Sequence, residues 1–254
     1  MLFEANRVTK RFGGLVAVND LSFTVRQSEI LGIFGPNGSG KTTTLSLIAG
    51  MIAPTEGRFS FEGSDITGVK PFRIADRGIV KTFQNPQLFP ELNVRAHMRI
   101  AAHLRSKRWH GWRRMQSLFQ LGETETGESD RIDEVLRLCR LTALADHRAS
   151  SLSYGAEKML GVAMAMMCEP KLLLLDEPTS GLGHAEVENL EVVLRSLRDH
   201  GVTLCIIDHK VTFLGRLADR AIALRHGTKI AEGPSQDVLR HPAVIEAYLG
   251  RAHA

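Results

Sequence analysis

A glycine-rich segment near the N-terminus carries the residues whose types and spacing point most directly to chemistry. Residues 35–42 read GPNGSGKT and fit the pattern G-x-x-x-x-G-K-[ST]. Glycines at this spacing let consecutive backbone N–H groups converge on an anion, and the lysine and hydroxyl that follow can reach phosphates and Mg²⁺. The sequence therefore predicts a cradle for a nucleoside triphosphate formed by Gly35, Pro36, Asn37, Gly38, Ser39, Gly40, Lys41, Thr42 and Thr43.

Two adjacent carboxylates follow an unbroken apolar run later in the chain. Asp176 and Glu177 come directly after four leucines at residues 172–175, a run typical of a buried strand. Ligands of open α/β sheets collect at the carboxyl ends of strands, so these acids can meet the cradle there. We expect Asp176 to hold Mg²⁺ and Glu177 to polarise an attacking water. Acids are also common in ordinary polar loops, so this prediction depends on the cradle.

The elements that must position these groups alternate along the chain. Residues 30–34 form an apolar run before the cradle, and residues 45–49 after it have helical spacing. A strand is predicted at residues 203–207, and an amphipathic helix is predicted between residues 187 and 197. Such alternation predicts an α/β fold with a parallel sheet, interrupted by a helical insertion at about residues 93–130.

The overall composition is that of an ordinary globular protein. The 254 residues are 43% hydrophobic and 24% charged, which excludes collagen-like, low-complexity and broadly disordered chains. A net charge of +4 is too small to indicate nucleic-acid binding by itself. The sequence has no apolar run of bilayer length and no signal-peptide pattern, and its three cysteines lack metal-site spacing. We therefore expect a chain that is soluble when isolated and works in a reducing compartment.

Kinases, GTPases and helicases also have such a phosphate cradle. Five shorter motifs distinguish among these classes of protein. TFQ at residues 82–84 follows the cradle, and LSYG at residues 152–155 precedes the acidic strand. Ser180-Gly181-Leu182 follows the acidic pair, His209 follows a later strand, and Phe12 precedes the cradle. In this order they resemble the Q-loop, signature motif, D-loop, switch histidine and adenine-stacking aromatic of ATP-binding-cassette (ABC) ATPases. The resemblance covers essentially the whole chain.

The resemblance implies a fold and an assembly. ABC ATPases are α/β P-loop NTPase cassettes with a RecA-like core, an antiparallel β subdomain and an inserted helical subdomain. For this chain it implies a core at about residues 1–90 and 166–254 and a helical subdomain at about residues 91–165. Two subunits, identical or related, face head to tail, so that each ATP lies between the P-loop of one and the signature segment of the other.

The resemblance also implies hydrolysis of ATP with Mg²⁺ and assigns roles to individual residues. The catalytic residues would be Glu177, His209 and Gln84. Phe12, Ser153 and Gly155 would contact the nucleotide together with the P-loop. The metal would be held by Thr42, Gln84 and Asp176.

Each of these motif residues also has an ordinary structural interpretation. Phe12 could belong to the core, as aromatic residues usually do. His209 could be a structural histidine with satisfied hydrogen bonds, and Gln84 could be a solvated loop residue. Ser153 could be a helix N-cap, which is compatible with an anion site because a capped helix N-terminus binds anions.

A narrower resemblance appears at both ends of the chain and in the insertion. RFGGLVAVN at residues 11–19, KTFQ at residues 81–84 and PAVIEAYLG at residues 242–250 are similar to the ATP-binding subunit of branched-chain amino-acid uptake transporters, as is the long insertion after Val94. That family imports hydrophobic amino acids, and relatives import urea or amides. It implies a peripheral subunit on the cytoplasmic side of the membrane, with partner permeases and an external solute-binding protein, and no nucleic acid.

Several positions depart from the family pattern. Ala156 and Glu157 follow the signature where glutamine is usual, Met164 replaces an arginine of the signature helix, and Gly183 ends the D-loop in place of Asp or Asn. These positions belong to the face that completes the partner's ATP site. We therefore expect good ATP binding but a weakened signature face, which a heteromeric partner would make tolerable.

Alternatives remain open at the level of function and for one segment. The chain could serve another ABC system, such as lipopolysaccharide export or a nucleic-acid- or ribosome-associated ATPase, or be a P-loop phosphotransferase. Residues 105–114 are basic and carry two tryptophans. They could approach anionic lipid headgroups or nucleic acid, but a solvated helical excursion with its tryptophans packed on the core is the favoured interpretation.

Overall fold

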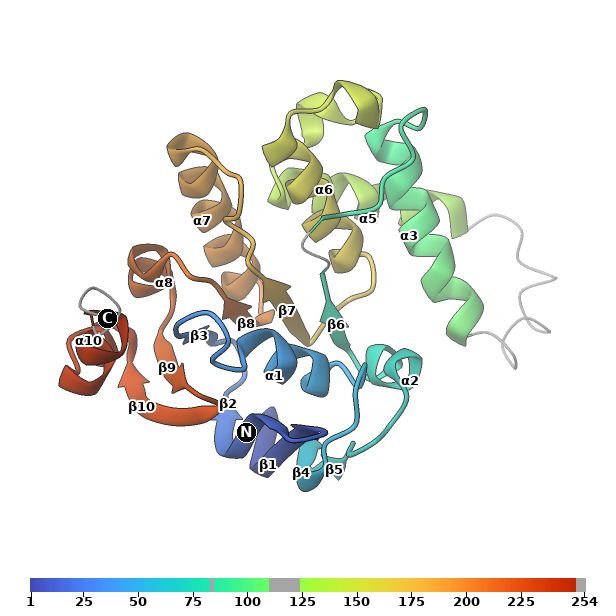
Figure 1. The fold of residues 1–254 in the computed structure, drawn as a ribbon. Helices are drawn as coiled ribbons and strands as arrows, with labels where there is room; N and C mark the ends of the chain where they lie inside the picture. The colour runs from blue at the N-terminus through green and yellow to red at the C-terminus, as the bar shows by residue number, and fades with distance from the viewer. Residues whose placement is uncertain (83–84, 110–123, 250–254) are drawn as a thin grey trace.

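The computed structural model describes residues 1–82, 85–109 and 124–249, and only the backbone at residues 104–109, 124–126 and 249. Two sheets form the centre, and helices gather around them (Figure 1). Within the described residues, no helix is both long and apolar enough to cross a membrane. The basic segment at residues 105–114 and Gln84 lie outside the residues whose side chains are described.

A six-stranded sheet forms the core. Its strands lie in the order β10 (Thr228–Pro234), β9 (Arg220–Arg225), β3 (Ile30–Phe34), β8 (Thr203–Ile207), β7 (Leu172–Asp176) and β6 (Ile79–Lys81). Every pairing is parallel except that of β10 with β9, which form a hairpin. The carboxyl ends of β3, β7 and β8 therefore meet at one edge, as the sequence predicts.

The central strands are apolar throughout because both faces of the sheet are covered. In β7, Leu173 and Leu175 face one hydrophobic cluster, whereas Leu172 and Leu174 face the other. Unbroken apolar runs are the expected pattern for strands of a parallel sheet buried on both sides. On the first face, the predicted amphipathic helix is α7 (His184–Asp199), and its five apolar stripe residues are all buried. Helix α8 (Val211–Leu217) lies beside it.

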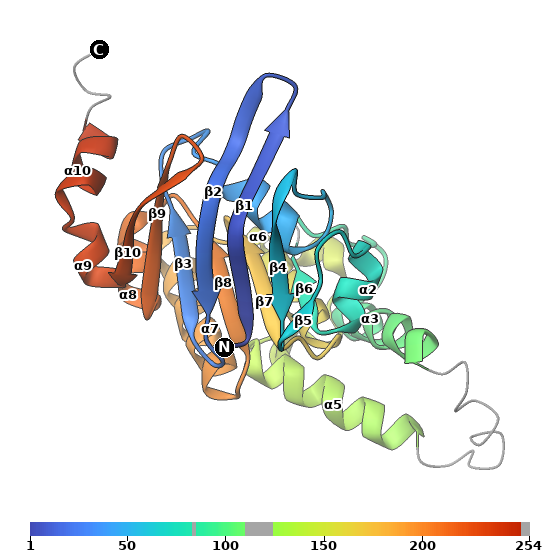
Figure 2. The ribbon, with the colours of Figure 1, turned by 90° about the horizontal axis from the view of Figure 1, so that it is seen from below.

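A four-stranded antiparallel sheet lies against the other face. Its order is β2 (Leu15–Val25), β1 (Phe3–Phe12), β4 (Glu56–Phe61) and β5 (Ser64–Asp65), and Figure 2 shows β1, β2 and β4 side by side. Alternate residues of β2, such as Leu21 and Phe23, are buried. Helix α1 (Lys41–Ile48) contributes Leu45 and Ile48 to the cluster that joins the two sheets. The start of α1, which follows the cradle, is thus held between them.

Helices α3 (Val94–Trp109), α5 (Thr124–Leu138) and α6 (Tyr154–Met166) contact one another and form the inserted helical part (Figure 1). Its apolar residues are continuous with the core cluster under α7. Helix α2 (Pro71–Asp76) leads into β6, and two short 3₁₀ turns, Thr142–Leu144 and Ala149–Ser151, precede α6. Helices α9 (Ser235–Leu239) and α10 (Pro242–Leu249) end the described chain. The subdomain limits near residues 91 and 165 stay a prediction.

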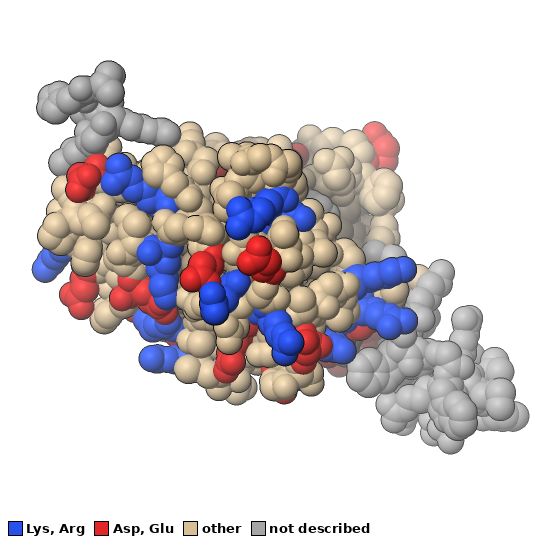
Figure 3. Space-filling model, turned by 60° about the horizontal axis from the view of Figure 1, so that its bottom comes forward, with Lys and Arg blue, Asp and Glu red and all other residues tan. Residues whose placement is uncertain are grey.

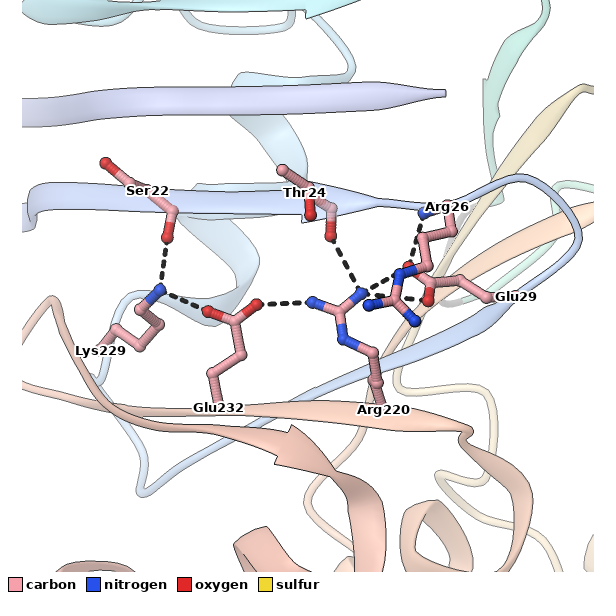
Figure 4. A network of polar contacts seen from close by, with 7 residues as sticks. All are labelled: Ser22, Thr24, Arg26, Glu29, Arg220, Lys229 and Glu232. Carbon is pink, nitrogen blue, oxygen red and sulfur yellow. Dashed lines mark hydrogen bonds and ion pairs between the residues drawn. The ribbon is translucent and has the colours of Figure 1, made fainter. Parts of the chain in front are cut away.

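A chain of charged side chains joins the two sheets at the amino end of β3 (Figure 4). Arg220 of β9 donates hydrogen bonds to Glu29 at 2.9 Å and to Glu232 of β10 at 2.6 Å. Lys229 pairs with Glu232 and donates to the carbonyl of Ser22 in β2 at 2.7 Å. The side chains of Arg220 and Glu29 are only 13% and 8% exposed, so this network fixes the antiparallel sheet to the core strands.

Candidate functional site

The glycine-rich segment forms the turn between β3 and α1. Gly38 and Gly40 have φ values of 78° and 98°, a region that side chains rarely adopt. A Cβ at Gly40 would also lie 2.4 Å from the carbonyl oxygen of Ala17 in β2. Lys41 folds back over the turn, where its Nζ donates to the carbonyls of Gly35 at 2.8 Å and Pro36 at 3.0 Å. The side chain of Lys41 thus bonds the end of the turn to its beginning.

The loop lines an open cleft of about 660 Å³. The other lining residues come from the β1–β2 hairpin, from the end of β7 and from the β9–β10 turn: Leu15, Val16, Ala17, Glu177 and His226. Inside the loop, the buried hydroxyl of Ser39 has no hydrogen-bond partner among the described residues. A buried polar atom without a partner is costly, and an anion held by the loop would satisfy it. The cleft therefore fits a phosphate chain.

The two predicted carboxylates lie at the carboxyl end of β7. Asp176 is 9% exposed, whereas Glu177 leaves the strand with a left-handed φ of 48°. Its backbone N–H donates to the carbonyl of Ile207 at 2.8 Å, which fixes the turn against β8. Because of this conformation the side chain of Glu177 reaches the cleft, and such a strained backbone at a strand end is typical of functional sites.

His209 follows β8 and lies beside Glu177. Its Nδ1 is 3.6 Å from Glu177 Oε2, and its side chain is 46% exposed. This half-exposed position beside a carboxylate that lines the cleft is not that of a buried structural histidine. The structure thus brings together two of the residues that the sequence singles out for catalysis.

Lys41 lies among carboxylates. Burial lowers its pKa below the usual value for lysine, and the nearby charges of Glu177, Asp176 and Asp208 oppose that shift. The three carboxylates therefore offset only part of the effect of burial on Lys41. This is the arrangement expected of a cation that must meet a polyphosphate in a partly dry cleft.

Asp208, at the end of β8, is a site residue that the sequence interpretation missed. It is fully buried and accepts hydrogen bonds from the backbone N–H and the hydroxyl of Thr179, at 3.1 and 2.7 Å. Lys210 donates to the carbonyls of Thr179 at 3.3 Å and Leu182 at 3.4 Å. The segment around His209 is thereby joined to the predicted D-loop. The sequence feature that could have identified Asp208 is its position as an acidic residue directly before His209.

Lys81, the last residue of β6, is a second residue that sequence reasoning missed. Its Nζ lies 3.0 Å from Oδ2 of Asp176. The residues needed for Mg²⁺ nevertheless fit, because Asp176 ends β7, Thr42 lies in the first turn of α1 after β3, and both carry oxygen ligands at the carboxyl edge of the parallel sheet. Gln84, the third predicted metal contact, lies outside the described residues.

The signature residues lie in another hollow of about 250 Å³, lined also by Leu182 and Glu186. Ser153 caps α6, since its hydroxyl accepts a hydrogen bond from the backbone N–H of Ala156 at 3.2 Å. Gly155 faces Glu186 so closely that a Cβ would lie 2.4 Å from its Oε1. One chain therefore does not bring Ser153 and Gly155 to its own P-loop cleft.

Phe12 lies at the end of the β1–β2 hairpin and is 47% exposed, with the ammonium of Lys10 5.0 Å from its ring centre. It pairs across the hairpin with Leu15, which lines the cleft. The alternative that Phe12 is a core residue is thus wrong. Its exposed ring remains suited to stacking on a planar ligand.

Comparison with known proteins identifies the family. Residues 18–180 match the family described as "ABC transporter". The chain belongs to the ABC ATPase family. Residues 228–254 of the cassette also match the family described as "Branched-chain amino acid ATP-binding cassette transporter".

Relatives are similar to the cassette over nearly their whole length. The "High-affinity branched-chain amino acid transport ATP-binding protein BraF" of Pseudomonas aeruginosa is 33% identical over 99% of this chain and 98% of its own. The protein LivG of Escherichia coli K12, with the same description, is 34% identical over 99% and 98%. A probable LivG of Archaeoglobus fulgidus is 34% identical over 98% and 95%.

Solved structures agree with the fold of the cassette. The ADP conformation of MJ1267, an ATP-binding cassette of an ABC transporter, superposes with a TM-score of 0.83 at 30% identity, covering 98% of both chains. A nucleotide-free ATP-binding cassette from an ABC transporter gives 0.81 at 28% identity, covering 97% and 98%. The predicted cassette fold and ATPase class are confirmed, and the P-loop phosphotransferase alternative is wrong.

Proposed function

We propose that this cassette is the ATP-hydrolysing subunit of an uptake transporter for branched-chain amino acids or a related small solute such as an amide or urea. The observation that carries the proposal is the full-length similarity to relatives described as branched-chain amino acid transport proteins, including the match at the C-terminal end. Specificity for the solute would then belong to partner permeases and an external solute-binding protein.

The geometry supports a division of work among the site residues. The P-loop from Gly35 to Thr43 holds the phosphates, and Phe12 stacks on the base. Thr42 and Asp176 would hold Mg²⁺, joined by Gln84 on the family resemblance alone, and the ion would neutralise charge that develops on the transferred phosphoryl group. Glu177 accepts a proton from the attacking water, and His209 beside it steadies that carboxylate.

The proposed working unit is a dimer of cassettes, identical or related. Its support is that Ser153 and Gly155 lie in a hollow separate from the P-loop cleft of the same chain. A second cassette facing head to tail would supply these residues to the open side of the cleft. The solved ABC transporter cassette MJ0796, at 23% identity, is described as dimeric, which is a statement about that protein.

The signature face carries the departures that favour a heteromeric partner. Glu157 lies in the first turn of α6 and Glu186 lies against Gly155, so two acidic side chains lie near the helix N-terminus that would meet a phosphate, in the hollow that the buried Lys158 also lines. Ala156, Met164 and Gly183 lack the hydrogen-bonding groups usual there. We propose that a homodimer of this cassette hydrolyses ATP slowly because of this signature face. Rapid turnover by the isolated homodimer would contradict this part of the proposal.

The location at the cytoplasmic face of the membrane follows from the proposed permease partners. Among the residues whose side chains are described, which exclude the basic segment at residues 105–114, the charge distribution gives the nucleic-acid alternative no support. Lys and Arg are interspersed with Asp and Glu on the face drawn in Figure 3, and ion pairs such as Arg7–Asp20 and Arg11–Glu56 neutralise exposed arginines of the antiparallel sheet.

The decisive experiment is purification of the chain with its membrane partners followed by reconstitution in proteoliposomes. We expect permease proteins to co-purify, and ATP-driven uptake of leucine, isoleucine or valine, or else of urea or a short amide. A complex with Lys41→Met should assemble but not transport. Export of a lipid by the complex, or co-purification with ribosomes in place of permeases, would refute the assignment.

A further inference from the structure

The strand edge that carries the predicted metal ligand also carries a lysine with no assigned role. Lys81 ends β6 and Asp176 ends β7, and the two strands are parallel neighbours. Their side chains form an ion pair with Nζ 3.0 Å from Oδ2, and they are only 12% and 10% exposed. The pair is therefore largely shielded from water, unlike most ion pairs between described residues.

The backbone fixes this pair in place. Lys81 lies opposite Leu174 in the sheet register. The next residue, Thr82, donates its backbone N–H to the carbonyl of Leu174 at 2.9 Å, and its hydroxyl lies 3.3 Å from the same oxygen. The lysine thus extends from a rigid strand end, and its ammonium is held at Asp176 by geometry as well as by charge.

Lys41, the other lysine of the site, forms its hydrogen bonds within the P-loop. Lys41 donates to the carbonyls of Gly35 and Pro36 in the loop. Among the described residues, Lys81 is the cation that forms an ion pair with Asp176. Breaking a buried pair leaves an uncompensated charge, so Asp176 needs either this ammonium or another cation.

A metal ion at Asp176 would meet this ammonium. Mg²⁺ binds carboxylate oxygens at about 2.0–2.1 Å, so a dication and the ammonium would share one carboxylate and repel each other. We propose that Lys81 is a tethered cation that neutralises Asp176 before the metal arrives and competes with Mg²⁺ for it, thereby limiting how strongly metal tightens nucleotide binding. This inference rests on the proposed role of Asp176 as a metal ligand.

Loss of the charge at Lys81 has opposite effects on two binding reactions. Without metal, Asp176 would be left as an unmasked anion beside the triphosphate, and nucleotide binding would weaken. With Mg²⁺, the competing ammonium is absent, and binding would tighten. The ratio of the two dissociation constants, metal-free over Mg²⁺-bound, should therefore rise by about tenfold or more.

The test measures that ratio on the full chain with the β,γ-imido analogue of ATP, which avoids hydrolysis. Calorimetry in excess EDTA and in excess Mg²⁺ gives both constants for the wild type, Lys81→Met and Lys81→Gln. Two neutral replacements of different polarity guard against a folding defect in one of them. Lys81→Arg keeps the charge and should keep the wild-type ratio.

Lys171→Met is the matched control. Lys171 directly precedes the same strand and pairs with Glu62 at 2.7 Å, but both side chains are about half exposed and lie at the opposite end of β7. The ratio of the metal-free to the Mg²⁺-bound dissociation constant of Lys171→Met should equal that of the wild type. A ratio in Lys81→Met and Lys81→Gln that is unchanged or smaller would overturn this inference alone, whereas a wild type that binds equally with and without Mg²⁺ would overturn the metal assignment of Asp176 too.

Discussion

Replacement of Glu177 by glutamine should separate nucleotide binding from hydrolysis in this cassette. Glutamine keeps the size and the shape of the side chain but removes its charge and its ability to accept a proton from water. The left-handed backbone at Glu177 and the hydrogen bond of its N–H to Ile207 do not involve the side chain, so the turn should persist. Only the chemistry at the edge of the cleft is changed.

The size of the effect follows from the role of the group. General-base catalysis contributes about 10²–10⁴-fold, which corresponds to about 3–5 kcal/mol of activation free energy. Glu177 is also the first of the carboxylates that favour the charged form of Lys41, and it lines the same cleft as the P-loop. Its charge would repel a triphosphate, so nucleotide affinity should be kept or increased in Glu177→Gln.

The assay compares phosphate release with nucleotide binding and assembly state. We expect phosphate release to fall at least a hundredfold, while light scattering with Mg²⁺-ATP shows a dimer, or a complex with the partner cassette, that persists longer than in the wild type. Glu188→Gln is the control, because Glu188 also pairs with a histidine, His184 at 3.4 Å, but on the exposed side of α7. It should leave turnover unchanged.

Two outcomes would refute the reasoning. Turnover of Glu177→Gln within about threefold of the wild type would show that another group activates the water. A loss of nucleotide binding equal to the loss of turnover would show that Glu177 supports the cleft and does not serve the chemical step.

Three further substitutions test the parts that support the site. Lys41→Met should weaken nucleotide binding at least tenfold in calorimetry, because a charge-assisted hydrogen bond contributes about 1.5–3 kcal/mol. Gly40→Ala should lower both the melting temperature and nucleotide affinity, with a strain of about 1–3 kcal/mol from its positive φ and a clash with the carbonyl of Ala17. Arg220→Met should cost about 3–5 kcal/mol in urea unfolding by leaving Glu29 buried without its ion-pair partner, and combining it with Glu29→Gln should recover part of that loss.

The fold and the motif residues were predictable because their signals are local. Apolar runs at residues 30–34, 172–175 and 203–207 are strands buried on both faces, and the spacing of the P-loop requires the turn that is observed. Phe12 could not be assigned to the surface or the core in advance, because an aromatic at a hairpin end has the same sequence pattern in both cases.

The ion pairs of the site could not be predicted, because they depend on which strands become neighbours. Lys81 and Asp176 meet only since β6 lies beside β7 in the sheet. Asp208 is likewise assigned by its contact with Thr179, which belongs to the loop after a different strand. The sequence around an acidic residue or a lysine at a strand end does not indicate its ion-pair partner. The order of the strands in the sheet identifies that partner.

The bonds between Asp208, Lys210 and the segment from Thr179 to Leu182 have a mechanical consequence. Two loops that leave separate strands are tied at four points, two of them to one fully buried carboxylate. If a neighbouring molecule moved residues 179–182, the hydrogen bonds to Asp208 and Lys210 would therefore move the segment that carries the imidazole of His209. The geometry around Glu177, the carboxylate proposed to activate water, would then be adjusted from outside the chain without any contact to the nucleotide itself.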